Sequence, residues 1–227
     1  MKKPQLATNL SENLEKLNVN REKASKLFAD VIEKAVKKSK PDTTALLEKD
    51  LDIETDLDNQ PANEPSPLKI AVLGGGSFGT AMANLSSKNG CEVTLWVRDK
   101  RSVKSMQKTH INKKYLPEHK LDERLQFTHD LQAAVKGKDL IFVAVPSAAF
   151  RETLQKIAPF ISAQAIVSLT KGMEKDTFAL MSDVIADELP NVAFGVMSGP
   201  NLAKEIMNNM PSATVIASQS AALRLAV

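Results

Sequence analysis

A glycine cluster that lies between an apolar run and a helical pattern constrains the fold of this chain more than any other feature. Residues 69–73 read KIAVL and predict a strand, and the alanine-rich pattern after residue 77 predicts a helix. Between them, Gly74, Gly76 and Gly79 fill the positions of a G-x-G-x-x-G motif. Gly74 allows a tight turn after the strand, and Gly76 allows the backbone to approach a pyrophosphate closely. Gly79 allows the helix to pack closely on the strand. A glycine-rich turn alone would fit an ordinary loop, but the flanking strand and helix favour a dinucleotide site with the anion at the helix N-terminus.

Composition limits the classes of protein to consider. The 227 residues are 43% hydrophobic and 25% charged, which is enough to bury one sizeable core and an appendage. The net charge of +3 is small, and no stripe of Lys and Arg interleaved with aromatic residues occurs. We therefore expect no nucleic-acid partner.

Cysteine content and apolar run length indicate the compartment. Cys91 is the only cysteine, which rules out a disulfide framework and suits a reducing environment. No apolar run approaches the roughly 18 residues of a transmembrane helix, and residues 1–4 lead into polar sequence rather than into a signal peptide. We expect a cytoplasmic protein without a transmembrane segment.

The first 67 residues differ from the rest of the chain. Residues 1–40 carry an apolar stripe at helical spacing and predict a helical extension, which would dock on its own protein or a partner; a basic amphipathic membrane helix is the alternative. Residues 41–67 are acidic and contain four prolines, which predicts a disordered linker. The alternating acids of residues 50–58 lack the spacing of a calcium-binding loop.

From residue 68 to residue 227, apolar strands alternate with amphipathic helices. This alternation predicts an α/β domain of the Rossmann type, with a doubly wound, mostly parallel sheet covered by helices on both faces. The expected strands are residues 69–73, 92–97, 125–127, 139–145, 165–169 and 192–197. A loop is expected around Asn112 and Tyr115.

The residue at the end of the second strand bears on the choice of dinucleotide. An acid at this position hydrogen-bonds the ribose 2′-hydroxyl, whereas an arginine accommodates a 2′-phosphate. Here Arg98 is followed by Asp99. The pair favours NADP(H) through Arg98 and leaves room for NAD(H) through Asp99, the alternative being a surface arginine without a ligand.

Later strands end in small polar residues and one lysine. Residues 165–169 are followed by Thr170-Lys171-Gly172, and residues 192–197 by Ser198-Gly199-Pro200-Asn201. In open α/β sheets, ligands bind outside the carboxyl ends of the strands, so these segments belong to the predicted site. His110, His119 and His129 have neither metal-ligand spacing nor a nucleophile beside them, so no metal site is expected.

The motifs together resemble a known family. The sequences GGGSFGTA from Gly74, WVRD from Trp96, VPS from Val145, TKGME from Thr170 and SGPNLAKE from Ser198 occur in one order, with Asn112 and Tyr115-Leu116-Pro117 between them. From about Leu68 to its end, the chain resembles the NAD(P)-dependent glycerol-3-phosphate dehydrogenases of bacteria.

The resemblance implies roles for individual residues. It places Ser77, Phe78, Arg98 and Ala203 at the dinucleotide, together with the three motif glycines. It places Lys171 at both the dinucleotide and the substrate. Gly199 and Asn201 are implied to lie near the substrate, although the family often has threonine at the position of Asn201.

One departure from the family pattern is large. The family carries its general-base lysine in a C-terminal helical domain, and this sequence reaches Val227 before any such motif. The expectation is therefore a chain truncated before that domain, holding the dinucleotide-binding half of an enzyme and no catalytic base.

The activity implied for the complete enzyme is reversible NAD(P)H-dependent reduction of dihydroxyacetone phosphate to sn-glycerol 3-phosphate, for glycerophospholipid biosynthesis. A lysine ammonium such as that of Lys171 would stabilise negative charge developing on the substrate. The alternatives are a non-catalytic NADP(H)-binding fragment and a related hydroxyacid dehydrogenase. A homo-oligomer is consistent with the sequence.

Overall fold

The computed structural model of this chain describes residues 67–227. The predicted helical extension of residues 1–40 and the predicted linker of residues 41–67 lie, apart from Pro67, outside the described residues.

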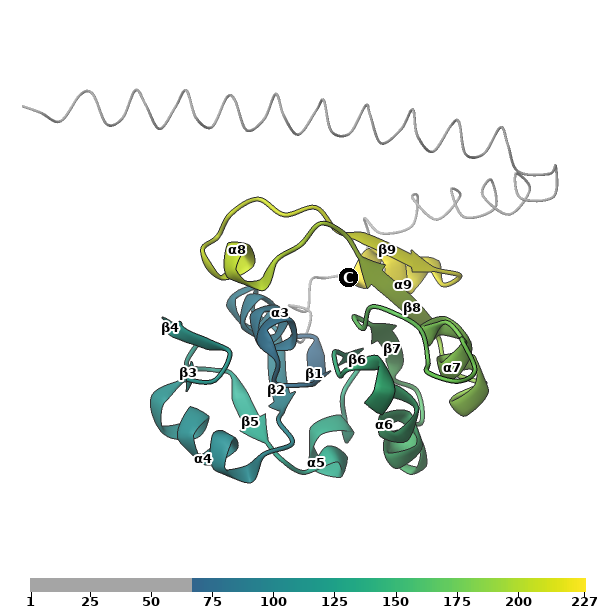
Figure 1. Cartoon of the computed structure of the whole chain (residues 1–227), viewed down its shortest axis with the longest axis horizontal. Helices are drawn as coiled ribbons and strands as arrows, with labels where there is room; N and C mark the ends of the chain where they lie inside the picture. The colour runs from purple at the N-terminus through teal and green to yellow at the C-terminus, as the bar shows by residue number, and fades with distance from the viewer. Residues whose placement is uncertain (1–66) are drawn as a thin grey trace, which may run out of the picture. The chain divides into compact units, whose positions relative to one another are not determined.

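The domain is built on one seven-stranded sheet (Figure 1). Its strand order is β5-β2-β1-β6-β7-β8-β9, and all neighbouring pairs are parallel except the last, β8 with β9. The strands are β1 (Lys69–Leu73), β2 (Glu92–Trp96), β5 (Gln126–Thr128), β6 (Leu140–Val143), β7 (Ala165–Ser168), β8 (Phe194–Ser198) and β9 (Val215–Ser218). The first six strands thus have the order of a Rossmann fold, which confirms the predicted fold class.

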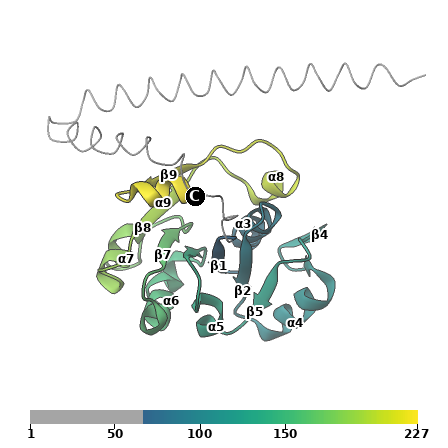
Figure 2. The same cartoon turned by 180° about the vertical axis from the view of Figure 1, so that it is seen from behind.

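Helices cover both faces of the sheet. One face packs against residues of α3 (Ser77–Lys88), α4 (Lys100–Thr109), α8 (Ala203–Met207) and α9 (Ala221–Ala226). The other face packs against α5 (Leu131–Val135), α6 (Phe150–Ile157) and α7 (Met181–Glu188), seen together below the sheet in Figure 2. Short 3₁₀ turns, Ser147–Ala149 and Ala158–Phe160, flank α6.

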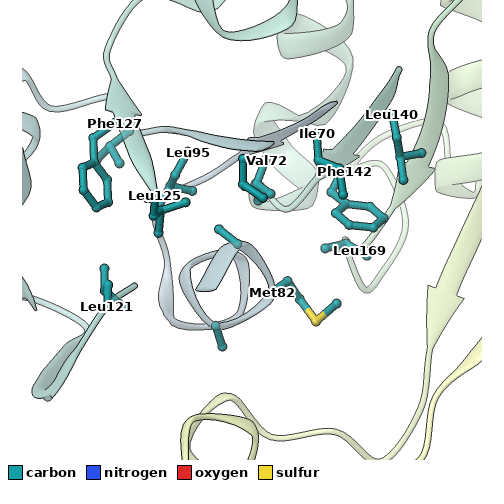
Figure 3. Close-up of a cluster of buried hydrophobic side chains, with 14 of the residues drawn as sticks. Ile70, Val72, Met82, Leu95, Leu121, Leu125, Phe127, Leu140, Phe142 and Leu169 are labelled. Carbon is teal, nitrogen blue, oxygen red and sulfur yellow. The ribbon is translucent and has the colours of Figure 1, made fainter. Parts of the chain in front are cut away.

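Alternation along β1 divides the core into two clusters. Ile70 and Val72 point to the α3 face, whereas Ala71 and Leu73 point to the α6 face, and all four are buried. Figure 3 shows Ile70, Val72 and Met82 within the first cluster, with side chains from neighbouring strands around helix α3. A central strand buried on both faces explains why residues 69–73 form a nearly continuous apolar run.

The chain reverses its direction of winding at β1. This strand pairs with β2 on one side and with β6 on the other. The strands β2 and β5, which come first along the chain, extend the sheet in one direction from β1, and the strands from β6 onward extend it in the other. A crevice opens at such a switch point, outside the carboxyl ends of the strands. The glycine segment from Gly74 to Gly79 begins at this edge of β1.

The β3–β4 hairpin and the edge strand β9 were not predicted. Where a loop was expected, β3 (Ile111–Asn112) and β4 (Leu116–Lys120) form a two-stranded antiparallel hairpin, too short and too interrupted by Pro117 for its alternation to be recognised. The antiparallel edge strand β9 was also not identified, because its residues are only partly buried. Among residues 67–227, no helix has both the length and the apolar character needed to cross a membrane.

Candidate functional site

The first and third motif glycines are required by the packing of the fold itself. Gly74 has φ +129°, and its N–H donates to the carbonyl oxygen of Trp96 at 3.1 Å. A Cβ atom on Gly74 would collide with the carbonyl oxygen of Ala144, and one on Gly79 would collide with that of Gly74. The tight turn and the close helix–strand contact that the motif predicts are therefore both present.

The second motif glycine is different, because nothing in the fold requires it. Gly76 is the N-cap of α3 at φ −71° and ψ −179°, and apart from its own chain neighbours no described atom lies within 4 Å of a Cβ built there. No side chain caps this end of α3, and its first turn contains no acidic residue in the described structure. The backbone N–H groups at Ser77 and Phe78 belong to that first turn, which has no intrahelical acceptors for them. An anion fits this end of the helix.

The glycine segment forms part of a cleft of about 800 Å³ at the switch point. This volume lies within the range of about 300 to 1,000 Å³ typical of ligand sites. Its walls include the ends of β1, β2, β6 and β7 and the start of α3. One face of α6 and the segment that leads into α8 also contribute. The lining includes Gly74, Gly76, Ser77, Phe78, Gly79, Arg98, Lys171, Asn201 and Ala203. Of the predicted site residues, only Gly199 is outside the lining, and it contacts Lys171 as described below.

Arg98 and Asp99 follow β2 at the rim of the cleft, but their side chains are differently engaged. The Oδ2 atom of Asp99 accepts hydrogen bonds from the hydroxyl and the backbone N–H of Ser102, both at 2.7 Å. These bonds cap α4 and hold the pKa of Asp99 below its ordinary value. Arg98 is exposed and lines the cleft. The carboxylate of Asp99 is thus already engaged in helix capping, whereas the side chain of Arg98 is exposed at the cleft.

A buried asparagine from the hairpin holds the glycine segment in place. The Nδ2 atom of Asn112 donates to the carbonyl oxygen of Gly75 at 3.0 Å and to Oγ1 of Thr80 at 2.8 Å. Its Oδ1 accepts from the backbone N–H of Tyr115 at 3.3 Å. Asn112 is 3% exposed. Its motif was recognised in the sequence but its role was not, because contact with a segment 37 residues away leaves no local pattern.

Lys171 lies at the far side of the cleft, on the turn after β7. The hydroxyl of Thr170 lies 2.7 Å from the carbonyl oxygen of Val145 and 3.2 Å from that of Val143, which fixes this turn to the end of β6. The Nζ atom of Lys171 donates to the carbonyl oxygen of Gly199 at 3.3 Å. The structure therefore brings together the Thr-Lys-Gly and Ser-Gly-Pro segments, as predicted from the rule for strand ends.

Arg151 on α6 forms ion pairs with Glu174, in the segment that follows Lys171. Arg151 donates from Nε to Oε1 of Glu174 at 2.7 Å and from Nη2 to Oε2 at 2.9 Å, and it also contacts Asp187 and Glu188. The bond from Arg151, with another from Thr177, lowers the pKa of Glu174 to about 2. This bidentate pair connects α6 to the segment that follows Lys171.

Asn201 contributes a buried polar atom with no partner. The residue is 4% exposed, and its Nδ2 donates to Oγ1 of Thr214 at 2.8 Å. Its Oδ1 has no hydrogen-bond partner among the described residues. A buried acceptor left without a donor is unfavourable, and Asn201 is one of the residues that line the cleft.

One face of α6 also lines the cleft and was not predicted from the sequence. Ala149, Glu152, Thr153 and Lys156 occur at helical spacing and reach the cleft, while Phe150, Leu154 and Ile157 are buried beneath the sheet. The polar residues Glu152, Thr153 and Lys156, which share one face of this helix, were the signal that could have identified this wall. Within residues 67–227, no group of three or more His, Cys, Asp or Glu side chains is arranged to hold a metal ion.

Comparison with known proteins places the domain in a family. The family described as NAD-dependent glycerol-3-phosphate dehydrogenase N-terminus matches residues 69–224. The chain belongs to this family. Its glycine segment, its Arg98 position and its Lys171 turn all lie inside the matched region.

Sequence relatives carry the same family name. The chain is 72% identical over 165 residues to glycerol-3-phosphate dehydrogenase [NAD(P)+] of Psychrobacter arcticus, which covers 73% of this chain and 38% of that protein. The relative from Psychrobacter cryohalolentis is 62% identical over 209 residues, covering 91% of this chain and 48% of its own length. The chain thus spans less than half the length of these curated relatives.

Solved structures of the family have the same fold. Glycerol-3-phosphate dehydrogenase from Coxiella burnetii is 38% identical with a TM-score of 0.66, covering 69% of this chain and 48% of that one. The enzyme from Plasmodium falciparum is 28% identical with a TM-score of 0.65, and the match covers 70% of this chain and 48% of that one. Both comparisons confirm the Rossmann-type architecture of this glycerol-3-phosphate dehydrogenase domain.

Proposed function

We propose that this domain binds NADP(H), and NAD(H) as a second dinucleotide, in the cleft at the carboxyl ends of the strands. The pyrophosphate would lie against Gly76 and the N–H groups of Ser77 and Phe78. Arg98 would face the adenosine ribose, and Ala203 would close the opposite wall. The N-terminus of α3 supplies N–H donors and a positive dipole end for the anion.

The reaction we propose for the protein is reversible reduction of dihydroxyacetone phosphate to sn-glycerol 3-phosphate, in the synthesis of glycerophospholipids. The bound dinucleotide supplies the hydride in such a reaction. Lys171 would attract the substrate phosphate and stabilise negative charge that develops on the reacting oxygen. Its hydrogen bond to Gly199 directs the ammonium group toward the segment that also carries Asn201.

The open space around Gly76, where a Cβ atom would meet no neighbouring atom of the fold, is the observation that carries this proposal. Gly74 and Gly79 are needed to pack the domain, but Gly76 is a glycine at which the fold tolerates a side chain. Close approach of the pyrophosphate to the backbone of the turn would explain why no side chain stands there.

A titration and an assay test the two parts separately. Calorimetric titration with NADPH and NADH measures binding by the domain. Oxidation of NADPH, followed by its absorbance in the presence of dihydroxyacetone phosphate, measures turnover. Absence of binding would reject the proposal, and turnover with a β-keto acid in place of dihydroxyacetone phosphate would reject the proposed substrate.

A second candidate function is dinucleotide binding without catalysis. The chain spans 38% and 48% of the two Psychrobacter relatives. Binding of NADPH without turnover would support this alternative for the chain as given. We also propose a cytoplasmic location and a small phosphorylated substrate as partner, which the single Cys91 and the cationic Lys171 support.

A further inference from the structure

We propose that the ion pair between Glu152 and Lys156 on α6 sets the preference of the cleft between NADPH and NADH. This inference rests on the proposed binding of a dinucleotide. Lys156 strengthens the attraction of the cleft for a ribose 2′-phosphate, and Glu152 opposes it. The opposing carboxylate keeps the difference between the two dinucleotides small.

The pair lies in the wall of the cleft rather than on an unrelated helix surface. The Nζ atom of Lys156 is 2.6 Å from Oε1 of Glu152, one helical turn away, and both side chains line the same cleft as Arg98. Thr153 on α6 and Ala149, which immediately precedes this helix, also line the cleft. The side chains of Lys156 and Glu152 are 58% and 67% exposed, so both charged groups are accessible from solvent.

The positive charge of Arg98 acts on the carboxylate of Glu152. The hydrogen bond and charge of Lys156 lower the pKa of Glu152, and the charge of Arg98 lowers it further. The charges of two cations therefore act on this carboxylate, that of Lys156 on α6 and that of Arg98 after β2. Asp99, the other acid at this rim, is occupied in capping α4. Lys114 and Lys171 are the remaining charged residues that line the cleft.

The two dinucleotides differ only at the ribose 2′-position, where NADPH carries a phosphate monoester. Such a group has a charge of about −1.5 to −2 near pH 7, because its second pKa is about 6. Arg98 and Lys156 attract this charge, whereas Glu152 repels it and holds Lys156 in an ion pair. Removing Glu152 would remove the repulsion and release Lys156, while removing Lys156 would leave the repulsion unopposed on α6.

Neutral variants of each partner separate this electrostatic role from a structural one. We expect Glu152→Gln to raise the ratio of NADPH to NADH affinity about threefold to fivefold, and Lys156→Gln to lower it by a similar factor, as for partly exposed charges. Loss of an ion pair that only stabilised α6 would change binding in the same direction in both variants. Opposite signs are therefore specific to the proposal.

The chain offers a matched control pair. Lys120 and Glu123 form an exposed ion pair of 2.8 Å that does not line the cleft. Lys120→Gln and Glu123→Gln make the same changes in net charge, and we expect both to leave the affinity ratio unchanged. Thermal unfolding followed by circular dichroism confirms that all four variants are folded before titration.

The measurement is calorimetric titration of the five proteins with NADPH and NADH at an ionic strength of about 0.01 M, where the Debye length is about 30 Å. Adenosine 2′,5′-bisphosphate and 5′-AMP serve as probes of the adenosine end alone and should give the same shifts. Ratios that match the controls, or that shift in one direction for both α6 variants, would overturn this inference alone. If the unchanged protein binds neither dinucleotide, the proposed function is rejected as well.

Discussion

The side-chain amide of Asn112 donates a 3.0 Å hydrogen bond to the carbonyl oxygen of Gly75, and thereby connects the β3–β4 hairpin to the middle of the glycine segment. The same nitrogen reaches Thr80 inside α3. The turn that we propose to hold a pyrophosphate is thus fixed from outside the sheet by one buried residue. The shape of the turn depends on this residue although it is not among the residues lining the cleft.

Replacing Asn112 with alanine should destabilise the domain and weaken dinucleotide binding together. Thr80 and the Gly75 carbonyl would lose a buried partner, at about 1 to 3 kcal/mol for each buried polar group left without one. Urea unfolding measures the loss of stability, and titration should show similar losses for NADPH and NADH. Asn191→Ala, at an exposed position, is the control and should change stability by less than about 0.5 kcal/mol. Full stability in the Asn112 variant would contradict the anchoring role.

Replacing Arg98 with alanine should affect the two dinucleotides unequally. The guanidinium offers paired donors to a 2′-phosphate, so the loss should be about 1 to 3 kcal/mol for NADPH and far less for NADH. Arg101→Ala, an exposed arginine in α4, provides the control. Equal losses for both dinucleotides, measured by calorimetry, would reject the role of Arg98 at the ribose.

The stability of the Lys171 region should depend on pH through Glu174. Its pKa is lowered from the ordinary value of 4.5 to about 2 by its bond to Arg151. The ionised carboxylate therefore stabilises the folded state above about pH 4.5, and this contribution is lost as the pH falls toward 2. Urea unfolding between pH 5 and pH 2 should show a shallower decline for Glu174→Gln than for the unchanged protein. Glu118→Gln, at an exposed position on β4, should retain the original slope.

The sequence allowed prediction of the sheet but only part of the site. Strands such as residues 69–73 are buried on both faces and so form apolar runs, and residues at strand ends, such as Lys171, are placed by topology alone. The anchoring by Asn112 and the cleft-facing stripe of Glu152 and Lys156 depend on which elements come together in space. Asp99 illustrates the same point, since its position suggested ribose binding while its carboxylate caps α4.

The contrast between Gly76 and its neighbours gives the central test of this account. Gly74 and Gly79 leave no space for a Cβ atom, so substitutions there would damage the fold and any loss of binding would be ambiguous. Gly76 has open space around it and a φ of −71°, which other residues adopt. A side chain at this position would stand where the pyrophosphate is proposed to approach.

The most direct measurement is calorimetric titration of Gly76→Val with NADPH and NADH, alongside circular dichroism and thermal unfolding. We predict a folded protein of nearly unchanged stability. Its affinity for both dinucleotides should fall at least about 100-fold, because two or more charge-assisted hydrogen bonds of about 1.5 to 3 kcal/mol each would be lost. A folded Gly76→Val protein that binds NADPH with nearly unchanged affinity would contradict the proposal that this turn holds the dinucleotide.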